Sequence, residues 1–266
     1  MSGFYLEIVR DEITVIGVDA RKFLHSQLAN DITSLPVGQS RYSLLLEPTG
    51  KITSLVRVRC IDEDTFVLDT EAGFGEITST RLSRFKIRIK CEIVVSSRTY
   101  FAFRELTIEQ HAKLISEVGS MNAWRGARLE LDVASMGTPE VAREKYFEIC
   151  QGTFGEYEHA RVLAAWPQMS IDMTSDSIPS ETGLTDIAVS FTKGCYPGQE
   201  LVERMDSRGT AAPRSLRVIR ATPGATAGSI VELDGKDIGI YTTVVNEIAL
   251  ALIKRNAESG SIQIGS

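Results

Sequence analysis

The chain has 266 residues, an apolar fraction of 43%, a charged fraction of 24% and a formal net charge of -6. This composition is typical of a globular protein with two or three structural units, and it excludes a collagen-like or disordered chain. The negative charge argues against a protein that holds long nucleic acid mainly through phosphate contacts. No apolar run reaches the length of a membrane span, and the first residues lack a secretory pattern, so we expect a soluble cytoplasmic protein with no membrane partner.

The four cysteines are far apart in the sequence and include no Cys-x-x-Cys pair; they are Cys60, Cys91, Cys150 and Cys195. A chain of this size does not need disulfide bonds for stability, so we expect free thiols. The three histidines are equally scattered. No ligand spacing therefore predicts a metal site.

Residue patterns predict alternating strands and helices in the first half of the chain. A β-branched run predicts a strand over residues 13–18, and Asp19 is placed to cap a following helix. Thr107 and Gln110 have the spacing of a capping box at another helix start. Further strands are predicted over 41–46, 55–61, 65–69, 87–93 and 129–133, and further helices over 76–85 and from Thr138 to about Cys150. Alternating arginines in the 55–61 run, including Arg57, indicate a sheet with one solvated face.

Short β-type runs continue from residue 211 to the end of the chain. They cover residues 215–221, 229–233, 238–245 and 249–254, separated by Pro-Gly and Asp-Gly turns. This part is predicted to be a small all-β unit. No fixed-period repeat and no long flexible linker separate it from the rest, so we expect packed units.

The segment Lys-Gly-Cys-Tyr-Pro-Gly-Gln-Glu, residues 193–200, carries the strongest functional signal. A strand is predicted over 188–192 and a helix from Gln199, which places Cys195 on the turn between them. Gly194 and Gly198 would allow unusual backbone conformations, while Lys193 and the helix N-terminus would favour the thiolate of Cys195. The alternative is a tight turn in which Cys195 is simply a small buried residue. A cysteine hydrolase is a further alternative, and it would need His25, His111 or His159 as its base.

The segment resembles the Lys-Gly-Cys-aromatic-x-Gly-Gln-Glu signature of the YgfZ family, relatives of the T-protein of the glycine cleavage system. The resemblance extends to Gly17–Ala20, Phe23–Leu28, Asn30-Asp31, Glu47–Lys51, Arg161 with Pro167, Ile178–Glu181, Val189–Phe191, Arg204, Gly209 and 239–250. It implies an α+β fold of three subdomains around a central channel, the last a small β-barrel. Residues 1–208 would then form a folate-binding region of two intertwined α+β subdomains, and 209–266 the C-terminal barrel.

The same resemblance implies a function. The chain would be a tetrahydrofolate-binding accessory protein that assembles or repairs iron–sulfur clusters, with client or assembly proteins as partners. Cys195 would be the working thiol and Lys193 its neighbour in the site. The remaining motif residues are Gly194, Tyr196, Gly198, Gln199 and Glu200.

For the folate itself, the resemblance suggests a set of contacts. Tyr157 or Trp166 would supply an aromatic wall for the pterin, and Glu181 a carboxylate for its nitrogens. Arg161, Arg204 and Arg208 would meet the glutamate tail, because a guanidinium binds a carboxylate through two hydrogen bonds. This chain departs from the family at Ala165, where a glycine is usual.

Two alternatives to the accessory role follow from the same comparison. The T-protein is an aminomethyltransferase with a catalytic carboxylate, and the matching stretch here, Thr49–Ser54, has Ser54 in its place. Whether the chain is an enzyme of one-carbon transfer is therefore left open by the residues. The second alternative is a non-catalytic scaffold in which the motif is purely structural.

Overall fold

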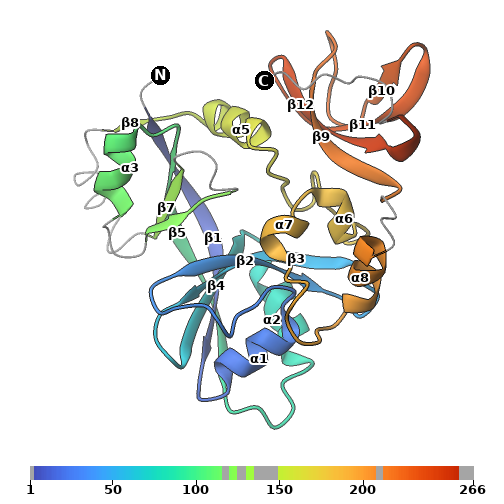
Figure 1. Cartoon of the computed structure of the whole chain (residues 1–266). Coiled ribbons are helices and arrows are strands. Elements are labelled where there is room, and N and C mark those ends of the chain that lie inside the picture. Colours follow the sequence, from blue (N-terminus) through green and yellow to red (C-terminus); the bar gives the residue numbers. More distant parts are fainter. Residues whose placement is uncertain (1–2, 116–119, 125–129, 135–148, 208–211, 258–266) are drawn as a thin grey trace.

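The computed structural model describes residues 3–115, 120–124, 130–134, 149–207 and 212–257 (Figure 1). A large curled sheet dominates the N-terminal half. Its strands are β1 (Phe4–Ile16), β2 (Ser40–Leu46), β3 (Ile52–Cys60), β4 (Thr65–Glu71), β5 (Glu92–Arg104), β6 (Ser120–Asn122) and β7 (Leu131–Ala134). They pair antiparallel in the order β2-β3-β4-β1-β5-β7-β6, and the short β8 (Cys150–Gln151) runs parallel to β1. Strands β1 and β5 pair along their whole length and connect the two ends of the sheet.

A second, separate sheet lies at the C-terminal end. It consists of β9 (Arg214–Arg220), β10 (Ile230–Leu233), β11 (Lys236–Val245) and β12 (Ile248–Lys254), antiparallel in the order β10-β11-β12-β9, and a short 3-10 turn, η1 (Arg255–Ala257), follows β12. This mixture of a curled sheet, helices and a separate β unit confirms the predicted α+β fold class. The predicted domain boundary at 208 and 209 lies outside the described residues.

Helices cover the curled sheet and join it to the second sheet. They are α1 (Ala20–Gln27), α2 (Gly75–Ser83), α3 (Ile108–Ile115), α5 (Phe154–Leu163), α6 (Pro179–Thr182), α7 (Thr185–Ala188) and α8 (Gln199–Ser207). Helix α5 contacts both β11 and β12, so it connects the two sheets (Figure 1). Within the described residues, no helix is both long and apolar enough to cross a membrane.

Two large apolar clusters form the core around this sheet. One lies beneath α1 and includes Phe23, Leu24 and Leu28 packed on residues of β3 and β4. The other lies between the sheet and the segments that follow α5, and it includes Trp124 and Trp166. The two faces of the sheet are therefore both covered, which explains why so many residues of β2 to β4 are buried.

Most predicted elements are confirmed, and the exceptions have identifiable causes. Residues 188–192 were predicted to be a strand, but α7 ends at Ala188 and a loop follows. The backbone of this loop bonds to the loop after α1, where the amide of Ser190 donates to the carbonyl of Ala29. The strand predicted from residue 87 begins only at Glu92. Asp19 does not cap α1; its carboxylate accepts the backbone N–H of Lys90. The helix predicted from Thr138 lies largely outside the described residues, and its predicted end, Cys150, lies in β8.

Candidate functional site

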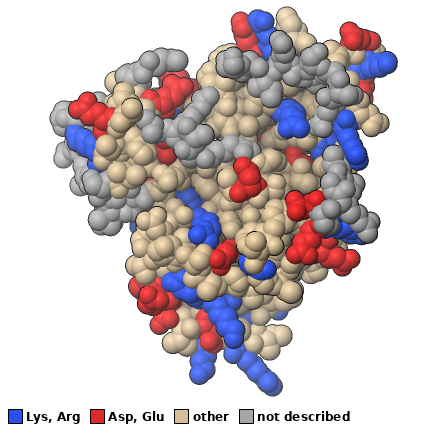
Figure 2. Space-filling view, viewed as in Figure 1, with Lys and Arg blue, Asp and Glu red and all other residues tan. Residues whose placement is uncertain are grey.

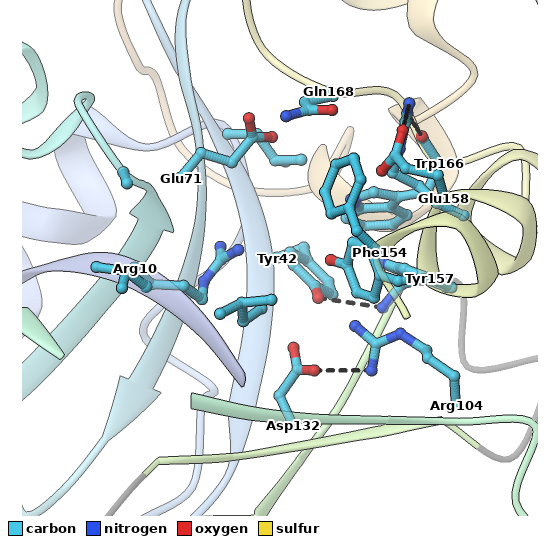
Figure 3. Close-up of a pocket in the computed structure, with 16 residues that line it drawn as sticks. Arg10, Tyr42, Glu71, Arg104, Asp132, Phe154, Tyr157, Glu158, Trp166 and Gln168 are labelled. Atoms are coloured by element: carbon cyan, nitrogen blue, oxygen red, sulfur yellow. Dashed lines mark hydrogen bonds and ion pairs between the residues drawn. The ribbon is translucent and has the colours of Figure 1, made fainter. Parts of the chain in front are cut away.

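A cavity of about 230 Å³ lies between the curled sheet and helix α5 (Figure 3). Strands β1, β2, β3 and β4 contribute one side of its lining, and α5 with the segment after it contributes the other. The cavity is therefore built from segments far apart in the sequence, held together by the sheet.

Aromatic rings form one wall of this cavity. The ring centroids of Tyr42 and Trp166 are 4.7 Å apart and tilted, as are those of Trp124 and Tyr157 at 5.5 Å. Phe154 lies further out, stacked with Tyr157 at 6.5 Å. Such a wall offers flat apolar surface to a planar ring system.

A layer of arginine and aspartate side chains lies at the floor of the cavity: Arg10, Arg104 and Asp132 line it, and Arg57 and Asp69 contact them without lining it. Asp69 accepts two hydrogen bonds from Arg57 at 3.0 Å and another from Arg10. Asp132 bridges Arg57 at 2.7 Å and Arg104 at 2.8 Å. Burial alone would raise the pKa of Asp132, but the positive charges of Arg104 and Arg57 outweigh it and lower that pKa to about 2. The layer thus joins three arginines to two aspartates.

Arg104 is the member of this layer that retains unused donors. Its guanidinium lies 4.0 Å from the ring centroid of Trp124 and 5.1 Å from that of Tyr157. Its Nε and one terminal nitrogen, Nη2, are buried and have no hydrogen-bond acceptor among the described residues. Buried donors without acceptors are uncommon, which marks this corner of the cavity as suited to a ligand oxygen.

Glu71 faces the same cavity from the end of β4 (Figure 3). Burial raises its pKa to about 7, although its carboxylate accepts the backbone N–H of Met169 at 3.2 Å. A carboxyl group that titrates near neutral pH can act as either a proton donor or an acceptor toward a ligand.

The aromatic residues predicted for folate binding, Tyr157 and Trp166, both line the cavity. Glu181 is not among the lining residues. Its carboxylate accepts the backbone N–H of Ile178 at the start of α6 and pairs with Arg214 at 2.8 Å. Arg204 is exposed on α8 and does not line the cavity, and Arg208 lies outside the described residues.

Arg161 reaches the cavity but is already fully engaged. Its five N–H groups donate to both oxygens of Glu158, to Asp172, to the carbonyl of Trp166 and to the hydroxyl of Thr243. It thereby ties α5 to β11. A ligand carboxylate would have to displace one of these partners, so the contacts of Arg161 support a structural role.

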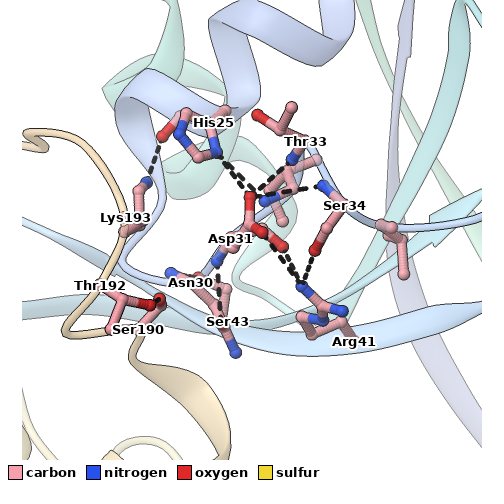
Figure 4. Close-up of polar contacts among 12 residues, drawn as sticks. His25, Asn30, Asp31, Thr33, Ser34, Arg41, Ser43, Ser190, Thr192 and Lys193 are labelled. Carbon is pink, nitrogen blue, oxygen red and sulfur yellow. Dashed lines mark hydrogen bonds and ion pairs between the residues drawn. The ribbon is translucent and has the colours of Figure 1, made fainter.

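Residues 193–198 of the segment form the loop before α8, next to the end of α1, and Gln199 and Glu200 begin the helix (Figure 4). The ammonium of Lys193 donates to the carbonyls of His25 and Leu28, the latter at 2.6 Å, and lies 5.0 Å from the ring centroid of Tyr196. These carbonyls belong to the last turn of α1, where a positive charge is favourable. Burial lowers the pKa of Lys193 to about 8, opposed by Asp31 and Cys195.

Beside this contact, His25 and Asp31 form a polar cluster on the loop after α1 (Figure 4). Their side chains are 3.1 Å apart, and Asp31 also accepts the backbone N–H groups of Thr33 and Ser34. Burial and the nearby Lys193 lower the pKa of His25. The cluster holds the carbonyls to which Lys193 binds.

Two motifs that are distant in the sequence meet at Gly198. This residue has a left-handed φ of 85°, and a Cβ there would stand 2.6 Å from the carbonyl oxygen of Glu47 and 3.0 Å from the Cα of Gly50. The loop therefore packs directly on the backbone of the turn between β2 and β3, and only glycine fits. Gly194 differs: its φ is not left-handed and a Cβ there would meet open space, so the expected special conformation at Gly194 is wrong.

The other motif residues have distinct environments. Cys195 is an exposed free thiol, so the alternative in which it is a small buried residue is wrong. Tyr196 is buried in the same apolar cluster as Trp124 and Trp166, which connects the loop to the cavity wall. Gln199 accepts the backbone N–H of Tyr196 at 3.3 Å, and Glu200 is exposed. Across the described residues, no group of three or more His, Cys, Asp or Glu side chains could hold a metal ion.

The carboxylates that line the cavity were not predicted from the sequence, where the search for a catalytic carboxylate led only to Ser54. Ser54 is buried on the opposite face of β3 from Leu55, and accepts a hydrogen bond from Thr78 at 2.8 Å. A usable signal existed, because charged residues alternate within the predicted strands. They were interpreted as a solvated face, but Arg57 is only 1% exposed and is paired with Asp69 and Asp132, so that face of β3 is buried.

Comparison with known proteins adds a family context. Residues 9–115 match the GCVT N-terminal domain family. The chain is 25% identical over 220 residues to a tRNA-modifying protein YgfZ of Vibrio atlanticus, covering 79% of this chain and 67% of that protein. It is 24% identical over 236 residues to an iron-sulfur cluster assembly factor IBA57 homolog, mitochondrial, of Neurospora crassa, covering 80% of this chain but only 52% of that protein.

Among solved structures, the glycine cleavage system aminomethyltransferase T of Bartonella henselae superposes with a TM-score of 0.80. The sequence identity is 19%, with 95% of this chain and 78% of that chain covered, so the likeness shows the fold. Together, the curled sheet, the separate β unit and the domain match define a GcvT-like fold. The relatives that it matches include proteins of the YgfZ type.

Proposed function

We propose that this protein binds tetrahydrofolate in the cavity beside α5 and serves as an accessory factor in assembling or repairing iron–sulfur clusters. The observation that carries the proposal is the combination of an aromatic wall with the unused buried donors of Arg104. The names of the relatives, one a tRNA-modifying protein and the other an iron–sulfur assembly factor, support the second half.

The size and chemistry of the cavity fit the pterin end of folate. Sites that bury a whole drug-sized ligand enclose roughly 300–1,000 Å³, and this cavity is smaller at about 230 Å³. A pterin is flat, carries a carbonyl oxygen that would satisfy Arg104, and presents N–H groups that would suit Glu71. The rest of the ligand would extend out of the cavity.

In this proposal, the exposed thiol of Cys195 contacts the client and Lys193 fixes the loop that carries it. The loop is anchored at three points: Lys193 on α1, Tyr196 in the apolar core and Gly198 on the turn after β2. An exposed thiol on an anchored loop is available to a macromolecular partner without refolding.

One-carbon transfer is a second candidate, favoured by a specific observation. A carboxyl group with a pKa of about 7, Glu71, stands in the cavity and has the proton affinity that general acid–base catalysis needs at neutral pH. Turnover of an aminomethylated carrier protein by the purified protein, lost in Glu71→Gln, would establish this activity in place of the accessory role.

The deciding experiment is calorimetric titration of tetrahydrofolate into wild type, Tyr157→Ala and Cys195→Ser, with Phe191→Ala as a control for loss of an exposed aromatic outside the cavity. Saturable binding that weakens at least tenfold in Tyr157→Ala, about 1.4 kcal/mol, and persists in the other two supports the folate site. Equal affinity of the wild type and all three variants would place the ligand elsewhere, and absence of binding to wild type would refute the folate proposal. Thermal melts of each variant exclude unfolding as the cause.

The accessory role has its own test. Cells that lack this protein should lose activity of iron–sulfur enzymes but not of enzymes without clusters, and Cys195→Ser should fail to restore it. Restoration by Cys195→Ser to the wild-type level would show that the thiol has no part in the function.

A further inference from the structure

The segment between α2 and β5 forms a positively charged tip at the lower end of the molecule (Figures 1 and 2). We call Arg84, Lys86, Arg88 and Lys90 the basic tip. Arg84, Arg88 and Lys90 are exposed, and Lys86 is half-buried. None of the four side chains forms an ion pair within the part of the chain that the structure describes. Other surface cations do pair, for example Lys51 with Asp176 at 2.6 Å and Lys254 with Asp237 at 2.9 Å.

Apolar side chains are exposed between these cations. Ile87 is 76% exposed and lies between Lys86 and Arg88. Val18 is 69% exposed, and its two neighbours in the chain, Gly17 and Asp19, both contact Lys90. Single exposed aliphatic residues are common, but here they lie within a cluster of unpaired cations. An apolar centre with a charged rim is the arrangement found in protein–protein interfaces.

The tip is also held in place. The backbone N–H of Lys90 donates to Asp19 at 2.8 Å, and Gly17 packs so closely that a Cβ would stand 2.3 Å from the Lys90 carbonyl oxygen. Arg88 has a left-handed φ of 61°, which reverses the chain between exposed Ile87 and half-buried Ile89. A surface fixed in this way loses little conformational entropy when a partner binds.

The position of the tip relates it to Cys195. The tip contacts the N-terminal end of α1 through Asp19, and Lys193 binds the carbonyls at the C-terminal end of the same helix. Eight helical residues span about 12 Å. The tip and the loop that carries the exposed thiol are therefore attached to opposite ends of one short helix.

We propose that the basic tip is the docking surface for a partner protein with an acidic surface around an apolar depression that receives Ile87. Only the identity of the partner rests on the proposed function: the partner would be the iron–sulfur client or assembly protein. A protein is favoured over nucleic acid or an anionic membrane because isolated aliphatic side chains have no role in phosphate contacts, and because the tip lacks the extended amphipathic face of a membrane-surface helix.

The test places a photo-crosslinking amino acid at position 87 of the full-length chain in cells, with the same residue at position 108 as a control. Ile108 on α3 is 80% exposed and has an acidic neighbour, Glu109. A discrete protein adduct at 87 but not at 108, identified by mass spectrometry as an acidic protein, is expected. Its yield should fall about tenfold when Arg84 and Arg88 are both changed to Glu, because rim charges govern association.

Three results would overturn the proposal: no protein adduct at 87, an adduct of unchanged yield in the double Glu variant, or adducts of RNA. In parallel, wild type is titrated with bulk tRNA and with vesicles of phosphatidylglycerol and phosphatidylcholine. Binding to either probe that the Arg84→Glu/Arg88→Glu variant abolishes would assign the tip to that polyanion instead. An adduct with an acidic protein that has no cluster would retain the docking surface and count against the proposed function, so the two failures are distinct.

Discussion

The buried ionic layer under the cavity gives a quantitative test of the fold. Replacing Asp132 by Asn removes the charge that bridges Arg57 and Arg104 while keeping the shape of the side chain. Breaking a buried ion pair costs about 3–5 kcal/mol. Arg57 keeps Asp69, and Arg104 keeps the carbonyls of Phe103 and Leu131, so we expect the lower end of that range, about 3 kcal/mol.

For a protein of this size, a loss of about 3 kcal/mol lowers the melting temperature by roughly 5 °C. Differential scanning calorimetry at pH 7 measures it, with Asp237→Asn as the matched control. Asp237 pairs with Lys254 at the same kind of distance, 2.9 Å, but on the surface, so its replacement should leave the melting temperature unchanged. Equal effects of the two substitutions would refute the idea that the layer stabilises the fold.

The pH dependence provides a second check on the same variant. The pKa of Asp132 is lowered from 3.8 to about 2 in the folded protein, so the stabilisation is complete above the ordinary pKa and is lost as the pH falls toward 2. The difference in melting temperature between wild type and Asp132→Asn should therefore be constant from pH 5 to 7 and smaller at pH 3. A difference that stays constant down to pH 3 would show that the charge of Asp132 is not its source.

Three further predictions concern single positions. Ala165 follows α5 with a left-handed φ of 52°, a conformation in which a glycine is unstrained. Ala165→Gly should therefore raise the free energy of unfolding, measured in urea, by roughly 0.5–1 kcal/mol. A decrease would contradict this. The pKa of Glu71 is raised from 4.5 to about 7, so the folded protein loses stability as the pH rises through this range. In urea titrations, Glu71→Gln should therefore be more stabilising at pH 8.5 than at pH 5.5, by about 2 kcal/mol. An effect that does not depend on pH would show that Glu71 is not the titrating group. Gly198→Ala should lower stability by about 2 kcal/mol in the same assay, whereas Gly194→Ala should have no effect; similar losses in both would contradict the close packing at Gly198.

The sequence predicted the elements with strong local signals and missed those set by distant contacts. The capping box of Thr107 and Gln110 forms as expected, because both of its hydrogen bonds are local. The run 188–192 has β-forming residues, but its backbone bonds to the loop after α1, a contact that no local pattern encodes. Likewise, Arg57 of β3 was predicted to be solvated because nothing in its own segment shows that Asp69 and Asp132 will bind it.

The candidate site was predicted in the same uneven way. The resemblance identified the segment 193–200, which is a contiguous motif, and the need for an aromatic wall pointed to two residues that line the cavity, Tyr157 and Trp166. Glu71, Arg104 and Asp132 come from three separate strands and meet only because the sheet curls. Side chains that converge through topology cannot be recognised from spacing alone.

The contact between Gly198 and the turn at Glu47–Lys51 restricts how this protein can change in length. Exposed turns between antiparallel strands usually accept inserted residues, because their backbone touches nothing. Here the turn is pressed against the loop of Cys195 with no side chain between the two backbones, and Leu201 packs on Gly50. An affinity tag, a fluorescent domain or a new chain terminus placed in this turn would displace the thiol loop, so such fusions are better placed at Gly38, where a side chain would meet open space.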